Sequence, residues 1–266
     1  MRIREIKCIS ILTKSKLPEC AYCINPYVGC VHGCIYCYAR FMKRFTGHKE
    51  EWGDFLDVRI NSPEVLRKQL SSRRIKRGTV LLGSVTDVYQ PLERKYNIVR
   101  SILEILLEYD FPISVLTKSD LVLRDIDLFK QFKECEVGLT MTNLDEQDSK
   151  NFEPCSSSPQ KRLKALEALR NEGVETYAFI GPVLPGVTNL NLIFSELRNK
   201  VDFVMVETLN IKCGNWEYIL ELIKEKYPQL LPIYHGLDKE YWDKVEFMTK
   251  ELSKKNKIPL KGFYKH

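Results

Sequence analysis

The stretch TVLLGSVTDVYQPLERKYNIVRSILEILLEYDFPISVLT, residues 79–117, places one helix between two short apolar strands. The runs 79–83 and 113–117 are almost free of charge, as strands buried on both faces of a sheet are. Between them, Ile98, Ile102 and Ile105 recur at the three- and four-residue spacing of an amphipathic helix. This order favours two parallel strands joined by a right-handed crossover.

The same unit repeats toward both ends of the chain. Further strands are expected at 137–141, 176–180 and 202–206, and a sixth near 22–25. Six parallel strands fit either an open doubly wound sheet or a barrel, complete or partial. In each of these folds the loops that follow the strands carry the chemistry.

Length and composition favour one folded domain over residues 1–266. The 44% of hydrophobic and 29% of charged residues exclude a disordered chain, and no linker or low-complexity stretch divides the sequence. Helices expected around 216–226 and 239–254 cover the end of the chain. No apolar run is long enough for a membrane span or a secretory signal, so we expect a cytoplasmic protein.

Five of the nine cysteines lie between residues 20 and 37. The loop NPYVGCVHGCIYCYAR, residues 25–40, contains Cys30, Cys34 and Cys37 in a C-x3-C-x2-C pattern. In a reducing compartment such spacing indicates metal or redox chemistry and not disulfides. Three thiolates on a tight loop suit an iron-sulfur cluster, and a cluster with three protein ligands leaves one iron open.

A zinc site is the alternative interpretation of these cysteines. Cys20 and Cys23, followed by Cys34 and Cys37, form two C-x2-C pairs that are typical of tetrahedral zinc. The chain would then be a nucleic-acid-binding module without catalysis. Zinc explains neither Cys30 nor the polar residues at later strand ends, so the cluster is the favoured hypothesis.

The cysteine loop resembles that of the radical S-adenosylmethionine (SAM) superfamily. With the segments GSVTD at 83–87, LTKS at 116–119 and IGPVLPG at 180–186, the chain is similar to the spore photoproduct lyase-like branch over residues 22–210. The resemblance implies a partial (β/α)6 TIM-like barrel, followed by a helical C-terminal extension at 211–266. It also implies a radical SAM enzyme with a 4Fe-4S cluster on Cys30, Cys34 and Cys37.

In that superfamily the cluster cleaves SAM reductively to methionine and a 5'-deoxyadenosyl radical, which abstracts hydrogen from a substrate. The resemblance implies that Tyr36 lies against the adenine. It also assigns four strand-end residues to the SAM pocket: Ser84, Thr86, Asp87 and Lys118.

One position departs from the family. Spore photoproduct lyases carry a hydrogen-donating cysteine three residues before the Asp that Asp87 matches, and Ser84 stands there in this chain. A serine O–H bond is too strong for that role, so thymine-dimer repair by this route is not expected.

Two kinds of partner are implied. The chemistry needs a reductant such as a ferredoxin or flavodoxin, and the family suggests a nucleic acid substrate. The net charge of +6 is a mild excess, and the basic run at residues 67–77 is typical of a solvated helix end.

Overall fold

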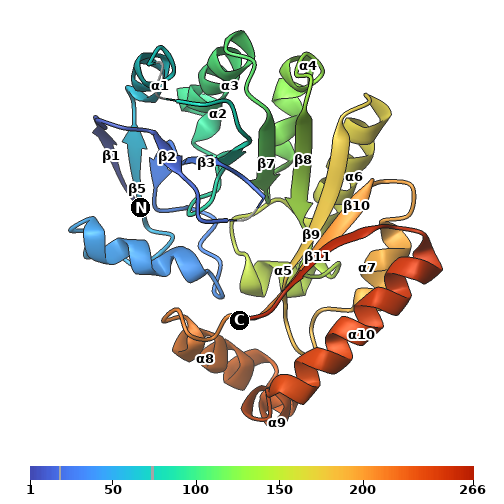
Figure 1. Ribbon diagram of the computed structural model, residues 1–266. Helices are drawn as coiled ribbons and strands as arrows, with labels where there is room; N and C mark the ends of the chain where they lie inside the picture. The colour runs from blue at the N-terminus through green and yellow to red at the C-terminus, as the bar shows by residue number, and fades with distance from the viewer. Residues whose placement is uncertain (18, 73–74) are drawn as a thin grey trace.

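The computed structural model describes residues 1–17, 19–72 and 75–266. Its main sheet has eight strands in the order β11-β10-β9-β8-β7-β6-β3-β2 (Figure 1). The strands are β2 (Leu12–Lys14), β3 (Tyr22–Ile24), β6 (Val80–Leu82), β7 (Ile113–Thr117), β8 (Cys135–Thr140), β9 (Glu175–Val183), β10 (Phe203–Thr208) and β11 (Leu260–Tyr264). All neighbours from β3 to β11 pair in parallel, and only the edge strand β2 is antiparallel.

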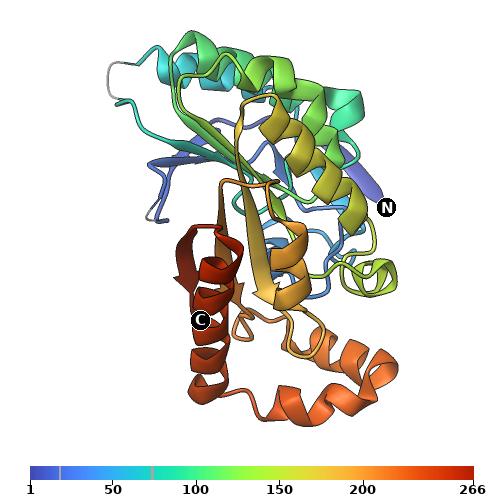
Figure 2. The ribbon, with the colours of Figure 1, turned by 90° about the vertical axis from the view of Figure 1, so that its right-hand side faces the viewer.

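The six predicted strands are confirmed as β3 and β6 to β10, and they form the predicted partial barrel. The helices that connect them line the outer side of the sheet (Figures 1 and 2). They are α1 (Ser62–Leu70), α2 (Glu93–Tyr96), α3 (Ile98–Glu108), η2 (Asp120–Asp125), α4 (Ile126–Phe129), α5 (Glu146–Phe152), α6 (Pro159–Asn171) and α7 (Leu190–Glu196). The main hydrophobic core lies between the sheet and α1, α3, α4, α6 and α7, whereas Phe152 of α5 packs in a second cluster with Cys34 and Tyr36.

Residues alternate between the two faces of each strand, as the strand period of two requires. On β7, Ile113 and Val115 belong to the core, whereas Ser114 and Leu116 line a cavity on the inner face. Gly138 on β8 is paired with Tyr177 on β9, and a Cβ at Gly138 would lie 2.2 Å from the tyrosine ring. The absent side chain therefore makes room for this ring.

A second sheet of three strands was not predicted. It has the order β1-β5-β4, with β1 (Arg2–Ile6), β5 (Phe55–Arg59) and β4 (Tyr27–Val28). Arg4 bonds the buried Asp57 carboxylate through Nε at 2.6 Å, and His48 Nε2 lies 2.9 Å from the same carboxylate. Because β4 leads into the cysteine loop, this sheet fixes one end of the loop.

The segment 211–266 is largely helical, as predicted, but it is not purely so. Helices α8 (Trp216–Lys226), η3 (Pro228–Leu230), α9 (Leu231–His235) and α10 (Lys239–Asn256) are followed by β11, which pairs with β10. The end of the extension differs from the predicted helical extension, because β11 pairs with β10 in the main sheet. None of the described helices has the length and apolarity needed to cross a membrane.

Candidate functional site

A cavity of about 440 Å³ lies on the inner face of the sheet. Cys30, Cys34 and Cys37 line it together with every residue that was predicted for the SAM pocket, namely Tyr36, Ser84, Thr86, Asp87 and Lys118. The structure thus brings the whole predicted site to one place, at the carboxyl ends of the strands. This is the position expected for a site in a barrel of parallel strands.

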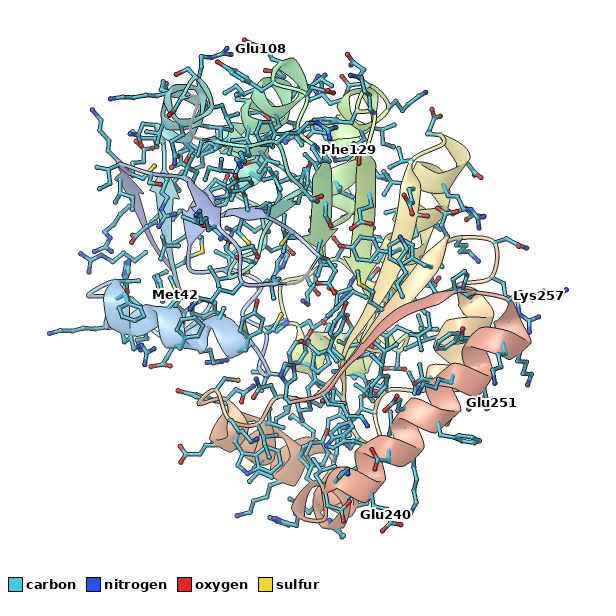
Figure 3. The ribbon with its side chains drawn as sticks, in the orientation of Figure 1. Met42, Glu108, Phe129, Glu240, Glu251 and Lys257 are labelled. Atoms are coloured by element: carbon cyan, nitrogen blue, oxygen red, sulfur yellow. The ribbon has the colours of Figure 1, made fainter. Side chains whose placement is uncertain are left out.

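The cysteine loop is held in place by glycines and by a neighbouring hydroxyl. Gly29 has φ of 88° and Gly33 has φ of 62°, a region that favours glycine. Thr86 Oγ1 donates to the carbonyl of Gly29 at 2.6 Å, which ties the loop after β6 to the cysteine loop. After Cys37 the chain forms the 3-10 helix η1 (Tyr38–Phe45), on which Met42 is labelled in Figure 3.

Replacing Gly29 by Ala is expected to destabilise the protein. The positive φ costs about 1–2 kcal/mol for a non-glycine residue, and the new Cβ would lie 2.6 Å from the carbonyl oxygen of Phe55, an overpacking worth about 1–3 kcal/mol. Gly47→Ala is the matched control, because Gly47 has φ of 69° with open space around it. Urea unfolding that shows equal losses for the two variants would contradict the steric argument.

The three thiols fit a metal cluster. None of them is in a disulfide, and burial raises the pKa of Cys37 to about 11 and that of Cys34 well above its ordinary value. A buried thiol gains most from a metal, which deprotonates its ligand. The ammonium of Lys118 faces Cys34 and favours its thiolate.

The four cysteines of the zinc alternative do not come together as a site for one metal ion in the described residues. Within residues 1–17, 19–72 and 75–266, no group of three or more His, Cys, Asp or Glu side chains is placed to hold a single metal ion. Cys23 lies on β3 and Cys20 just before it, whereas Cys34 and Cys37 belong to the loop that follows β4. A 4Fe-4S cluster differs from zinc because its thiolates bind separate iron atoms.

Asp87 is fully engaged with the protein. Its Oδ1 accepts from Thr117 Oγ1 at 2.6 Å and from the Tyr89 amide at 2.9 Å, and its Oδ2 accepts from the Lys118 amide at 2.7 Å. His32 Nδ1 lies 3.3 Å from Oδ2. Although burial alone would raise the pKa of Asp87, His32 lowers it to about 2. These contacts give Asp87 a positioning role, and its contact with SAM stays a prediction.

Lys118 and Ser84 differ in whether their polar groups are already bonded to other residues of the protein. Ser84 Oγ accepts from Asn25 Nδ2 at 2.9 Å. The ammonium of Lys118 forms no ion pair within the described chain and lies 5.8 Å from the centre of the Tyr36 ring. Burial lowers the pKa of Lys118, but Cys34, Glu153 and Asp87 outweigh burial and raise it. Lys118 therefore presents a charged group to the cavity.

A buried ion pair beneath Tyr36 was missed by sequence reasoning. The Tyr36 hydroxyl donates to Glu153, which also pairs with Arg162. Arg162 is 2% exposed and also donates to the carbonyls of Ser157 and Thr140, both at 2.8 Å. More than a hundred residues separate Tyr36 from Glu153, and no motif links them.

The far wall of the cavity was also not predicted. It is formed by inner-face residues of the last strands and by the end of the chain, among them Tyr177, Phe179, Met205, Glu207, Tyr264 and His266. His266 Nε2 lies 2.9 Å from Glu207 Oε1, and the Tyr264 hydroxyl bonds Glu19. These side chains line the same cavity as the residues predicted for the SAM pocket.

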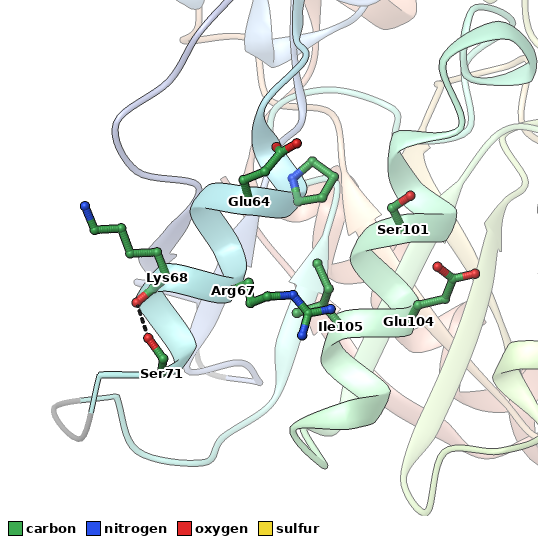
Figure 4. Close-up of a pocket in the computed structure, with 8 residues that line it drawn as sticks. Glu64, Arg67, Lys68, Ser71, Ser101, Glu104 and Ile105 are labelled. Atoms are coloured by element: carbon green, nitrogen blue, oxygen red, sulfur yellow. Dashed lines mark hydrogen bonds between the residues drawn. The ribbon is translucent and has the colours of Figure 1, made fainter.

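The basic run at residues 67–77 lies outside the cavity of the cysteines. Arg67 pairs with Glu108 at 2.6 Å, and Arg77 pairs with Glu134 at 2.6 Å. Figure 4 shows Arg67 in a surface pocket between α1 and α3, and this pocket shares no residue with the cavity of the cysteines. Arg73 and Arg74 of the run lie outside the described residues.

The fold and this cysteine-lined cavity define a class of enzyme. Residues 24–192 match the model of the radical SAM superfamily, so the chain belongs to this family and is a radical SAM enzyme. An uncharacterized protein of Methanocaldococcus jannaschii is 36% identical over the whole chain and 98% of its own length. A radical SAM Nalpha-GlyT isomerase of Pseudomonas phage M6 is 27% identical over 61% of this chain and 33% of its own.

Among solved structures, the chain is similar to spore photoproduct lyase. A variant of that enzyme with bound AdoMet (SAM) and dinucleoside spore photoproduct superposes with a TM-score of 0.70 over 99% of this chain and 80% of the other, at 15% identity. The resemblance drawn from the sequence motifs is thereby confirmed at the level of the fold. Radical SAM enzymes require an electron donor, and this requirement extends to the present chain.

Proposed function

We propose that Cys30, Cys34 and Cys37 hold a 4Fe-4S cluster and that the chain binds and reductively cleaves SAM in the adjoining cavity. The observation that carries this proposal is the convergence of two buried thiols, the partly buried thiol of Cys37 and the strand-end residues on one cavity. When bound, the cluster supplies one electron to SAM, which yields methionine and the 5'-deoxyadenosyl radical that abstracts hydrogen from the substrate.

The residues around the cavity suit this ligand. Lys118 offers an unpaired ammonium for the SAM carboxylate, and the ring of Tyr36 offers a flat wall for the adenine. Ser84 and Thr86 line the same cavity, and their hydroxyl oxygens are proposed as acceptors for the ribose hydroxyls. Asp87 holds the loops after β6 and β7 together, so that these groups keep their positions.

The substrate occupies the far part of the cavity in this proposal. A nucleic acid component is the substrate class to test first, because a solved spore photoproduct lyase holds a dinucleoside. Ser84 argues against hydrogen return by a cysteine at that position. We propose a ferredoxin or flavodoxin as the electron donor and the cytoplasm as the location.

Anaerobic reconstitution tests the proposal. The protein is loaded with iron and sulfide and then given SAM and dithionite, and 5'-deoxyadenosine is measured by liquid chromatography. We expect a brown protein with about four iron and four labile sulfide per chain, and product that depends on both SAM and dithionite. A colourless protein, or a loaded protein that never cleaves SAM, would refute the proposal.

A further inference from the structure

A second pocket, of about 590 Å³, opens on the surface beside the cysteine loop. Four basic residues and one acidic residue contribute to its wall: Arg40, Lys43, Arg44, Lys212 and Glu51. Arg40, Lys43 and Arg44 lie on η1, which follows the last of the three loop cysteines. Lys212 comes from the loop after β10. We call this feature the basic pocket.

Most of the positive charge in the basic pocket is not neutralised. Lys43 bonds Glu51 at 3.1 Å. The guanidinium of Arg40 lies 4.3 Å from the centre of the Tyr218 ring, and that of Arg44 lies 4.7 Å from that of Phe45. In the part of the chain that the structure describes, neither these arginines nor Lys212 has a carboxylate partner. The basic pocket therefore presents a positive surface to an approaching molecule.

Exposed apolar side chains surround this charge. Phe45 is 67% exposed and Tyr218 is 41% exposed, and Ile211 is close to Lys212 in sequence and also exposed. Arginine and aromatic residues are enriched where proteins bind one another, and they supply most hot spots. The mixture of unpaired cations and exposed rings fits a protein partner that carries an acidic surface.

One buried tryptophan connects the basic pocket with the cysteine cavity. Trp52 lines both, is 6% exposed, and packs in a small cluster with Cys30 and Phe55. Its indole N–H has no hydrogen-bond partner in the described residues. Arg40 adds a second link, since its Nη2 donates to the Cys34 carbonyl at 3.3 Å. Trp52 and Arg40 therefore connect the wall of the basic pocket with the cysteine loop.

We infer that the basic pocket is the docking surface for an acidic electron-transfer protein, a step that rests on the proposed function. One electron passes from the reduced donor, which is oxidised by one electron, to the cluster on the three cysteines, which is reduced by one. Opposite charges steer such encounters, which bury little area and depend on salt. Electron transfer also needs a short path, and the contacts of Trp52 and Arg40 supply it.

A nucleic acid fits the positive charge of the basic pocket less well than an acidic protein does. A duplex is bound through a row of phosphate contacts, which requires basic residues along an extended track. The basic pocket is compact, and it shares no residue with the pocket between α1 and α3 that contains Arg67 and Lys68. Its charge is placed for a small partner next to the cysteines.

Charge reversal at Arg44 and Lys212 tests this inference. Neither residue belongs to the residues proposed to bind the cluster or SAM. The control for the double variant R44E/K212E is K68E/K164E, which makes the same charge change on α1 and α6. The probe is an acidic flavodoxin in its hydroquinone form. Its affinity for each cluster-loaded protein is measured by fluorescence titration, and the rate of cluster reduction is followed by stopped-flow absorbance at several salt concentrations.

We expect R44E/K212E to lower the reduction rate and the affinity by about tenfold or more at low salt, and K68E/K164E to leave both close to wild type. Dithionite-driven SAM cleavage should be unchanged in both variants. Equal flavodoxin rates in all three proteins would overturn the docking surface, as would an equal loss in R44E/K212E and K68E/K164E. If wild type itself fails to cleave SAM with dithionite, the proposed function fails and not the docking surface alone.

Discussion

Cys34→Ala is expected to remove the iron-sulfur cluster and to reduce 5'-deoxyadenosine formation to background. Cys34 is buried, faces Lys118 and lies between the other two loop thiols in sequence. Two remaining cysteines cannot hold a cluster that needs three protein ligands, so both iron content and product should be lost. Iron and labile sulfide analysis, together with electron paramagnetic resonance of the reduced protein, measures this directly.

Cys20→Ala is the matched control for this experiment. Cys20 lines the same cavity, but it lies before β3 and its thiol contacts Ser15 Oγ at 3.1 Å. Cluster content should therefore stay at the wild-type level. Full cluster content in Cys34→Ala, or its loss in Cys20→Ala, would show that the ligands are assigned incorrectly.

Arg162→Met should lower the free energy of unfolding by about 3–5 kcal/mol, because it leaves the carboxylate of Glu153 buried without its partner. The guanidinium also satisfies the Thr140 carbonyl and the hydroxyls of Ser149 and Ser156. Urea unfolding of the apoprotein gives the value. Since Glu153 accepts from the Tyr36 hydroxyl, the variant should also disturb the wall of the cavity.

Two further variants separate the buried ion pair from a general effect of losing an arginine. Arg170→Met lies on the same helix α6, where the side chain is 36% exposed and pairs with Asp202 at 3.3 Å. Its loss should cost less than about 1 kcal/mol. The double variant E153L/R162M should recover much of the stability, because no lone charge stays buried. Equal costs for Arg162→Met and Arg170→Met would contradict this account.

The sequence was sufficient for the central barrel and for the cysteine loop. Strands β6 to β10 are short and apolar because both of their faces are covered. This local pattern can be recognised in a single sequence. β11 was missed because its stretch LKGFY contains Lys261 and Gly262 in a lysine-rich region, and pairing with β10 stabilises it. β1 was missed for a similar reason, since its partner β5 is about fifty residues away.

The residues of the site also divide into those that the sequence pattern predicts and those that it does not. Cys30, Cys34 and Cys37 are recognisable because they lie close together in a C-x3-C-x2-C spacing, and Thr86 and Lys118 stand at strand ends that the pattern locates. Long-range contacts carry no such signal. Glu153 meets Tyr36 from 117 positions away, and Asn215 Nδ2 donates to the Tyr36 carbonyl from 179 positions away. Only the folded chain shows that these groups support the site.

Because of its position, Trp52 can serve as an intrinsic fluorescence probe of the cysteine loop. The chain has three tryptophans, and Trp52 packs in a cluster with Cys30, a proposed cluster ligand. An iron-sulfur cluster absorbs across the near-ultraviolet and visible range and accepts excitation energy from a neighbouring indole. We therefore expect the emission of Trp52 to fall as the proposed cluster assembles, so that assembly in the intact protein can be followed without labels.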